Sequence, residues 1–226
     1  MDDLTVIYYT ANAVPEKFGV FVRATLQEAI KQIPLISVSQ KPLIFGHNIC
    51  IGNIGRSHIN IYKQALIGAK AATTKYIALA EDDILYSSDH FTYRPQPDTF
   101  AYDMSVWSIY TWVSPPIFSY KGRRNLSQLV CERQLFIDAM EERFKKYPDE
   151  SKINIAIWAE PGKYEKNLAV TERKSELYYS HVPSVAFSHE TALSFLNLGK
   201  RKKLGELRVT ALPQWGSAEE VIRCYV

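Results

Sequence analysis

The chain has 226 residues, of which 46% are hydrophobic and 12% aromatic, and its formal net charge at pH 7 is +3. This composition is sufficient for the core of one large domain or of two closely packed lobes, and it excludes a disordered chain. The small net charge does not by itself indicate a nucleic-acid partner.

Cysteine usage and hydropathy bear on the compartment. Cys50, Cys131 and Cys224 are widely separated and lack metal-ligand spacing, which is typical of structural thiols in a reducing environment. The N-terminus has neither the basic flank nor the long apolar core of a signal peptide, and no apolar run approaches the length of a membrane span. We therefore expect a cytoplasmic protein without a transmembrane segment.

The chain begins with a predicted strand, helix and strand. Residues 4–9 and 35–39 are short apolar runs, which are typical of buried strands. Between them, Pro15 suits the first position of a helix whose apolar face extends to Ile33. The polar loop after the first strand lies where a parallel sheet binds its ligands.

The same alternation continues in the next segment. A short strand is expected at 48–51, followed by a glycine-containing loop and by Ser57, which is placed to cap a second helix. The apolar period of that helix leaves Lys63, Gln64 and Lys70 towards water. Strand, helix, strand, loop, helix and strand together predict a right-handed parallel α/β unit.

Three carboxylates end the next apolar run. The run at 76–80 is expected to be a buried strand, and Glu81, Asp82 and Asp83 follow it at once. Alternation along a strand points Glu81 and Asp83 to one face and Asp82 to the other. A divalent cation relieves the repulsion between such charges, and oxygen ligands favour Mg²⁺ or Mn²⁺. The alternative is a solvated acidic turn.

The second half of the chain is aromatic and less regular. Residues 100–102 and 106–112 predict strands of a small mixed extension beside the main sheet. Most of the aromatic residues are expected in its core, with Trp107 and Trp112 as candidates for an acceptor wall. Residues 126–147 have a helical period that places Arg143 on the wet face.

Two stretches carry a resemblance to a known family. The order Gly55-Arg56-Ser57-His58-Ile59-Asn60, a helix with small residues and the segment 74–83 resembles nucleotide-sugar glycosyltransferases of the GT-A fold, particularly family-2-like members. The opening segment 6–12 is similar to their first strand and nucleotide-contacting loop. One departure is Glu81, where many relatives have Asp.

The resemblance implies an architecture. A GT-A-like, mostly parallel sheet flanked by helices is expected, with a smaller mixed α+β lobe on the acceptor side. Residues 1–103 would form the nucleotide-sugar-binding half of a single domain, and residues 104–226 the acceptor-side half.

The resemblance also implies roles for individual residues. The nucleotide would be contacted by four of them: Thr10, Asn12, Arg56 and Lys63. Asp83, Glu81 and His189 would hold the metal ion, and an imidazole ligand suits Mn²⁺ better than Mg²⁺. The alternative for His189, which follows a predicted strand at 182–188, is a hydrogen-bonded structural histidine.

An acidic residue of the second lobe is expected to be the catalytic base. Glu160 follows a short apolar segment and matches the position of that element in the family. Glu165 and Glu172 are competitors, and a surface turn with an ordinary glutamate is the alternative. A single base without a second nucleophile predicts inversion at the anomeric carbon.

The sequence therefore predicts a metal-dependent glycosyltransferase that uses a nucleotide-sugar, preferably UDP-linked. A GT-A-like module that only binds nucleotide or glycan is the alternative. Basic runs at 121–124 and 200–203 lie in the acceptor-side half. A compact, anchor-free transferase of this kind resembles those with which some bacteriophages glycosylate hydroxymethylated bases of their own DNA. Solvated loops, or contact with anionic lipid or a lipid-linked acceptor, are the other interpretations.

Overall fold

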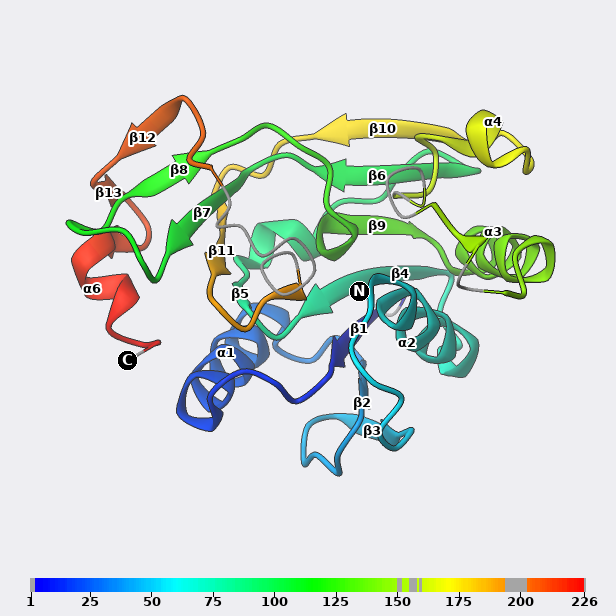
Figure 1. Ribbon diagram of the computed structural model, residues 1–226, viewed down its shortest axis with the longest axis horizontal. Coiled ribbons are helices and arrows are strands. Elements are labelled where there is room, and N and C mark those ends of the chain that lie inside the picture. Colours follow the sequence, from blue (N-terminus) through cyan, green and yellow to red (C-terminus); the bar gives the residue numbers. More distant parts are fainter. Residues whose placement is uncertain (1–2, 150–151, 155–157, 159, 194–202, 226) are drawn as a thin grey trace.

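A seven-stranded sheet with the order β10–β6–β9–β4–β1–β2–β3 forms the centre of the protein (Figure 1). The computed structural model describes residues 3–149, 152–154, 158, 160–193 and 203–225. The strands of this sheet are β1 (Leu4–Thr10), β2 (Leu35–Ser39), β3 (His47–Cys50), β4 (Tyr76–Glu81), β6 (Thr99–Asp103), β9 (Leu129–Glu132) and β10 (Lys174–Tyr178). Only β9 runs antiparallel to its neighbours, so the carboxyl ends of β1, β2 and β4 meet at one edge.

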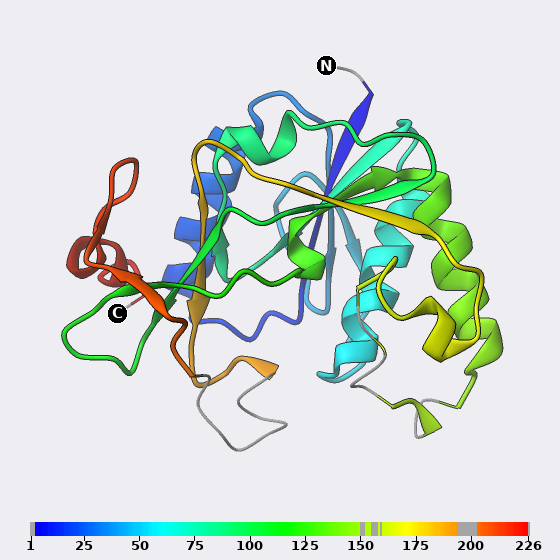
Figure 2. The same ribbon diagram turned by 90° about the horizontal axis from the view of Figure 1, so that it is seen from above.

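Helices cover both faces of this sheet (Figures 1 and 2). They are α1 (Glu16–Ile30) on one face, and α2 (His58–Ala71) and α3 (Arg133–Lys146) on the other. Alternate residues of β1 serve the two layers: Val6 and Tyr8 pack with Leu26 of α1, whereas Ile7 packs with Tyr62 of α2. The α/β fold with a mostly parallel sheet is thus confirmed. No helix in the described part of the chain is long and apolar enough to cross a membrane.

A smaller mixed sheet lies beside the large one, with the order β12–β8–β7–β11–β5. Its strands are β5 (Ile84–Leu85), β7 (Val106–Tyr110), β8 (Phe118–Tyr120), β11 (Ser184–Ser188) and β12 (Leu207–Val209). Helix α6 (Ala218–Ile222) and the first turns of α1 pack on one face, where Phe18 and Val221 join Phe118 and Phe187 in a common core. The expected mixed lobe is therefore present.

The remaining elements are short. Strands β13 (Ala211–Leu212) and β14 (Gly216–Ser217) form a two-stranded sheet. The others are the 3₁₀ turns η1 (Ser88–Phe91) and η2 (Leu126–Gln128) and the one-turn helix α4 (Glu165–Leu168). Ser217 caps α6 in a capping box with Glu220.

Two sequence predictions about the second half were wrong. The segment predicted as one helix over 126–147 contains η2 and β9 before α3 begins, because the apolar run Leu129–Cys131 is buried as a strand between β4 and β6. The strand predicted at 100–102 belongs to the large sheet as β6, and not to the smaller extension. The large sheet therefore takes β9 and β10 from beyond residue 103.

Candidate active site

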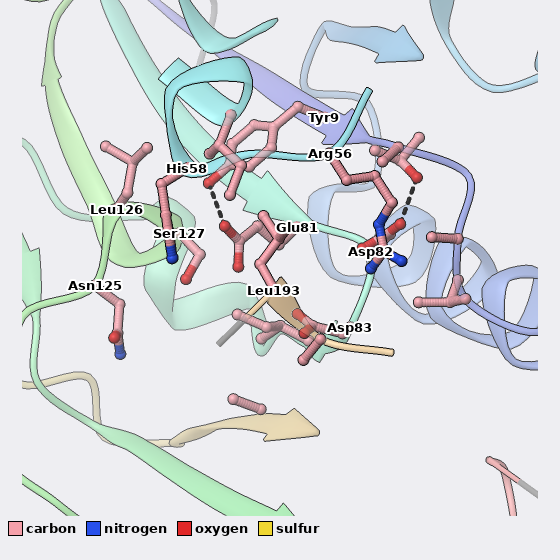
Figure 3. A pocket seen from close by; sticks show the side chains of 18 of the residues that line it. Tyr9, Arg56, His58, Glu81, Asp82, Asp83, Asn125, Leu126, Ser127 and Leu193 are labelled. Carbon is pink, nitrogen blue, oxygen red and sulfur yellow. Dashed lines mark hydrogen bonds between the residues drawn. The ribbon is translucent and has the colours of Figure 1, made fainter. Parts of the chain in front are cut away.

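A pocket opens where the carboxyl ends of β1 and β4 meet the smaller sheet (Figure 3). Its walls include six of the eight residues that the sequence singled out: Thr10, Arg56, Glu81, Asp83, Glu160 and His189. The other two, Asn12 and Lys63, are not among the described residues that line it. The fold thus gathers residues from both halves of the chain at the edge where parallel sheets bind ligands.

The three carboxylates after β4 have different surroundings. Glu81 lies opposite Tyr9 in the parallel ladder, and its Oε1 accepts a hydrogen bond of 2.9 Å from the Tyr9 hydroxyl. Asp82 accepts a hydrogen bond from the Thr10 hydroxyl (Figure 3). Burial, and then the neighbouring charge of Asp83, raise the pKa of Asp82 to about 6. Glu81 and Asp82 are therefore each held by a side chain of β1.

Asp83 faces the imidazole of His189, which follows β11. The His189 Nε2 lies 3.4 Å from the Asp83 Oδ2, and Nδ1 lies 2.8 Å from the hydroxyl of Thr191. His189 is 3% exposed, and its Nε2 makes no hydrogen bond within the described residues. When Nδ1–H donates to Thr191, the Nε2 lone pair faces Asp83, which is the arrangement that metal-binding histidines require.

This pair fits a divalent metal, but the expected trio is not preformed. Within the described ranges, no three His, Cys, Asp or Glu side chains are close enough to hold an ion. Mg²⁺ and Mn²⁺ usually keep several waters and take substrate phosphates, so one or two protein ligands suffice. Asp83 with the buried, unsatisfied nitrogen of His189 meets that requirement, whereas Glu81 is directed to Tyr9.

Two amide side chains shape the loops at the edge of the pocket. Gln64 was predicted towards water but is 2% exposed, and its Nε2 donates to the carbonyls of Thr10 and Val38 at 2.8 and 3.0 Å. It is buried because these carbonyls, at the end of β1 and one residue before the end of β2, need donors. Asn12 has a φ of 53°, and its Oδ1 accepts the N–H groups of Gln40 and Lys41, both at 2.9 Å. Asn12 therefore ties the loop after β1 to the loop after β2.

The N-terminus of α2 forms another wall. Ser57 caps the helix as predicted, with its hydroxyl accepting the Asn60 N–H at 3.0 Å. Arg56 donates to the carbonyl oxygen of Thr191, so this wall contacts the loop that carries His189. His58 also lines the pocket (Figure 3), although the sequence interpretation gave it no role. The sequence did offer a signal for His58 as a pocket residue, because it directly follows the Ser57 cap within the segment that carried the family resemblance.

Glu160 reaches the pocket from a turn that several hydrogen bonds fix. The Pro161 carbonyl accepts from the Tyr102 hydroxyl at 2.6 Å, and the Gly162 carbonyl accepts from the Ser175 hydroxyl at 2.8 Å. Gly162 has a φ of 81°, and a Cβ there would lie 2.7 Å from the Ser175 Cβ. Only glycine fits this position. The preceding residues 155–157 and 159 lie outside the described part of the chain.

The two competitors of Glu160 do not line the pocket. Glu165 forms a buried ion pair with Arg143, with an N–O distance of 2.9 Å, and the same Oε1 accepts the Gly162 N–H at 2.5 Å. Arg143 was predicted on the wet face of its helix, but it is completely buried and its guanidinium lies over the ring of Trp158. Glu172 is exposed. The Arg143–Glu165 pair instead supports the turn that presents Glu160.

The acceptor-wall candidates also lie elsewhere. Trp107 packs against the core shared by α1, α6 and the smaller sheet, and neither it nor Trp112 lines the pocket. That side of the pocket is polar instead, with Ser108, Arg123 and Asn125 in its wall.

Comparisons with known proteins give only distant similarities. No family model and no curated protein matches the sequence. A nucleotidyl transferase from Methanothermobacter has 10% identity and a TM-score of 0.47, with 80% of this chain and 88% of that chain covered. A glycosyltransferase involved in glycosylation of the major capsid of PBCV-1 has 9% identity and a TM-score of 0.45, with 81% and 92% covered.

A Drosophila β-1,4-galactosyltransferase 7 mutant in complex with manganese, UDP-Gal and xylobiose has 12% identity and a TM-score of 0.39, with 79% of this chain and 65% of that chain covered. Because these similarities are so low, the function proposed below depends on the residues of the site itself.

Proposed function

We propose that the protein is a metal-dependent glycosyltransferase that moves a sugar from a nucleotide donor, preferably UDP-linked, to a hydroxyl group. One observation supports this most directly. A single pocket at the strand ends contains an open Asp83–His189 pair and, from a different element, the carboxylate of Glu160. Transfer from a nucleoside diphosphate needs both parts, because charge develops on the leaving phosphates while the acceptor loses a proton.

The donor end contains the carboxylates. Asp83 and His189 would hold the ion, with Mn²⁺ preferred because one ligand is an imidazole. When bound, the ion would neutralise the charge that accumulates on the departing diphosphate. Glu81 adds negative charge that draws a cation to this wall, and Thr10 and Arg56 are placed to contact the donor. Asn12 and Lys63 make no direct contact with the donor in this proposal.

The acceptor end contains the base. Glu160 would take the proton of the acceptor hydroxyl as that oxygen attacks the anomeric carbon and the nucleoside diphosphate leaves. A single displacement inverts the anomeric configuration. The proton NMR coupling of the freshly formed product tests this step, and a retained configuration would remove the role of Glu160.

The functional division of the chain follows the same two ends. We keep residues 1–103 as the donor half and 104–226 as the acceptor half, with His189 reaching back to the metal. Hydroxymethylated DNA bases remain a proposed acceptor, supported by Arg123 of the first basic run, which lines the pocket. In the second run, residues 200–202 lie outside the described residues. Incubation with UDP-sugars and DNA containing 5-hydroxymethyl pyrimidines, followed by nucleoside mass spectrometry, tests this acceptor.

The proposal is tested without an acceptor by donor hydrolysis. We expect Mn²⁺ to stimulate release of UDP from at least one of a panel of UDP-sugars, and Asp83→Ala to abolish the stimulation. Glu28→Ala, which removes an exposed carboxylate of α1, is the matched control. Calorimetry that shows donor binding, with no turnover across donors and acceptors, would favour the nucleotide- or glycan-binding module instead.

A further inference from the structure

Three cations gather around Tyr110 on the acceptor side. Lys121 follows β8, and its Nζ lies 5.4 Å from the centroid of the Tyr110 ring. Arg208 lies on β12, opposite Ser119 of β8. Burial raises the pKa of Tyr110, and hydrogen bonds with Ser119 and Ser108, followed by the positive charges of Arg123 and Arg208, partly offset that rise. All three cations therefore act on one point of the smaller sheet.

In the described part of the chain, no carboxylate forms an ion pair with Lys121, Arg123 or Arg208. Partial burial, and then the charge of Arg123, lower the pKa of Lys121 to about 8. Lys121 is half-buried, whereas Arg123 and Arg208 are exposed. An anion bound between them would relieve the repulsion among these like charges.

The neighbouring Arg124 is engaged differently. Its Nη1 donates to the Gly162 carbonyl at 3.3 Å, and its guanidinium lies over the ring of Tyr102. Gly162 belongs to the turn that presents Glu160, and Tyr102 of β6 donates its hydroxyl to the Pro161 carbonyl of the same turn. The loop between β8 and η2 is thereby attached to that turn, and this leaves Arg123 to face the pocket.

The cluster reaches the pocket at its acceptor end. Arg123 lines the same pocket as Glu160, and so does Asn125, two residues further along the loop. In Figure 3, Asn125 lies towards one end and Arg56 with Asp82 towards the other, with Glu81 and Asp83 between them. An anion bound at the Asn125 end would therefore be separated by the carboxylates from a diphosphate bound at the Arg56 end.

We propose that Lys121, Arg123 and Arg208 bind a phosphate ester carried by the acceptor, close to the hydroxyl that receives the sugar. The inference rests on the proposed function. A planar guanidinium pairs with phosphate oxygens through two parallel hydrogen bonds, and Lys121 adds a point charge. The substrate class is thus a phosphorylated alcohol, and not a neutral glycan.

Calorimetric titration with glycerol 3-phosphate tests the site, first with the protein alone and then with UDP and Mn²⁺ already bound. We expect binding in both cases, weakened by about 10- to 100-fold in Arg123→Ala, as the loss of a charge-assisted contact predicts. Lys145→Ala, an exposed lysine of α3, should stay within about twofold of the wild type. The affinity for UDP should be unchanged in Arg123→Ala.

Two results would overturn the proposal. If UDP with Mn²⁺ abolished glycerol 3-phosphate binding, the cluster would belong to the donor site. The same would follow if Arg123→Ala lowered the affinity for UDP as much as the affinity for glycerol 3-phosphate. If Arg123→Ala and Lys145→Ala had equal effects, the cluster would be a solvated surface. The titration needs no turnover, so its result is independent of Mn²⁺-stimulated donor hydrolysis. Either experiment can therefore fail while the other succeeds, which distinguishes failure of this inference from failure of the proposed function.

A second ligand identifies the source of the phosphate. A single-stranded DNA decamer that binds more than about tenfold tighter than glycerol 3-phosphate, with affinity falling steeply with salt, would assign the ester to a nucleic-acid backbone. Equal affinities would assign it to a small phosphorylated acceptor.

Discussion

Two charge pairs contribute to the site, and they differ in whether the protein encloses them or leaves them open to the pocket. In the Arg143–Glu165 pair, both residues are buried, and one carboxylate oxygen accepts from both the guanidinium and the Gly162 N–H. The Arg143 Nε, like the His189 Nε2, makes no hydrogen bond to a described residue. In the Asp83–His189 pair, the imidazole Nε2 is buried without a hydrogen bond to a described residue, and Asp83 is 21% exposed to the pocket.

The difference separates structural charge from functional charge. We call the Arg143–Glu165 pair closed, because both of its charged side chains are buried and interact with other protein groups. Removing one partner of a closed pair should lower the stability of the fold. We call the Asp83–His189 pair open, because it faces the pocket and can bind a metal ion. Removing one partner of an open pair should lower the affinity for the metal and donor and the rate of transfer. The predictions below test this division, from the largest expected effect to the smallest.

Glu160→Gln should have the largest kinetic effect. The substitution keeps the shape of the side chain but removes its basicity, so kcat for transfer should fall by about 10²- to 10³-fold. The affinity for the donor, measured by calorimetry, should stay within about twofold, because Glu160 acts on the acceptor. An equal loss of donor affinity would place Glu160 on the donor side.

Glu165→Ala should have the largest effect on stability. Leaving Arg143 buried without its partner is expected to cost about 3 kcal/mol of the free energy of unfolding, measured by urea denaturation. Asp83→Ala should change the same quantity by less than about 1 kcal/mol, because Asp83 faces the pocket. Equal costs in the two variants would contradict the division between closed and open pairs, and exposed Glu172→Ala is the control.

Asp103 provides a pH test of a second closed carboxylate. Burial would raise its pKa, but contacts with His90, Ser180 and the Ser105 N–H outweigh burial and lower it. The stabilisation is therefore present above the pKa of an unfolded aspartate, about 3.9, and is lost as the pH falls below that value. The difference in urea midpoint between wild type and Asp103→Asn should be large at pH 6 and shrink towards pH 3. A constant difference would contradict the assignment.

Lys63→Ala should have the smallest effect. Lys63 is not among the described residues of the pocket wall, so the affinity for UDP should change by less than about twofold. Arg56 lies at the pocket wall, so Arg56→Ala should lower the affinity for UDP by about tenfold if the guanidinium contacts the phosphates. The reverse order of effects would return Lys63 to the donor site.

Much of the fold was readable from local sequence. The strands β1 and β2 follow from apolar runs buried on both faces, and the start of α2 from its serine cap. Strand β9 was missed because its apolar residues run directly into α3 and continue the helical period. What makes it a strand is hydrogen bonding to β4 and β6, which are distant in sequence.

The candidate site was readable only in part. The carboxylates at the end of β4 stand out because charge follows a buried run, and the family resemblance suggested His189 and Glu160. The burial of Arg143 and Gln64 was not predictable from the helical period, because each satisfies a group brought near by tertiary structure: the Glu165 carboxylate, and the carbonyls of Thr10 and Val38. The cations around Tyr110 likewise come together only through the pairing of β7, β8 and β12.

Calorimetric titration of UDP with and without Mn²⁺ tests the central claim most directly. The wild-type protein and Glu28→Ala should bind UDP at least about tenfold tighter with Mn²⁺, since the ion would link the diphosphate to Asp83 and His189. Asp83→Ala and His189→Ala should each lose that enhancement while keeping a wild-type circular dichroism spectrum. An undiminished enhancement by Mn²⁺ in both variants would contradict the account.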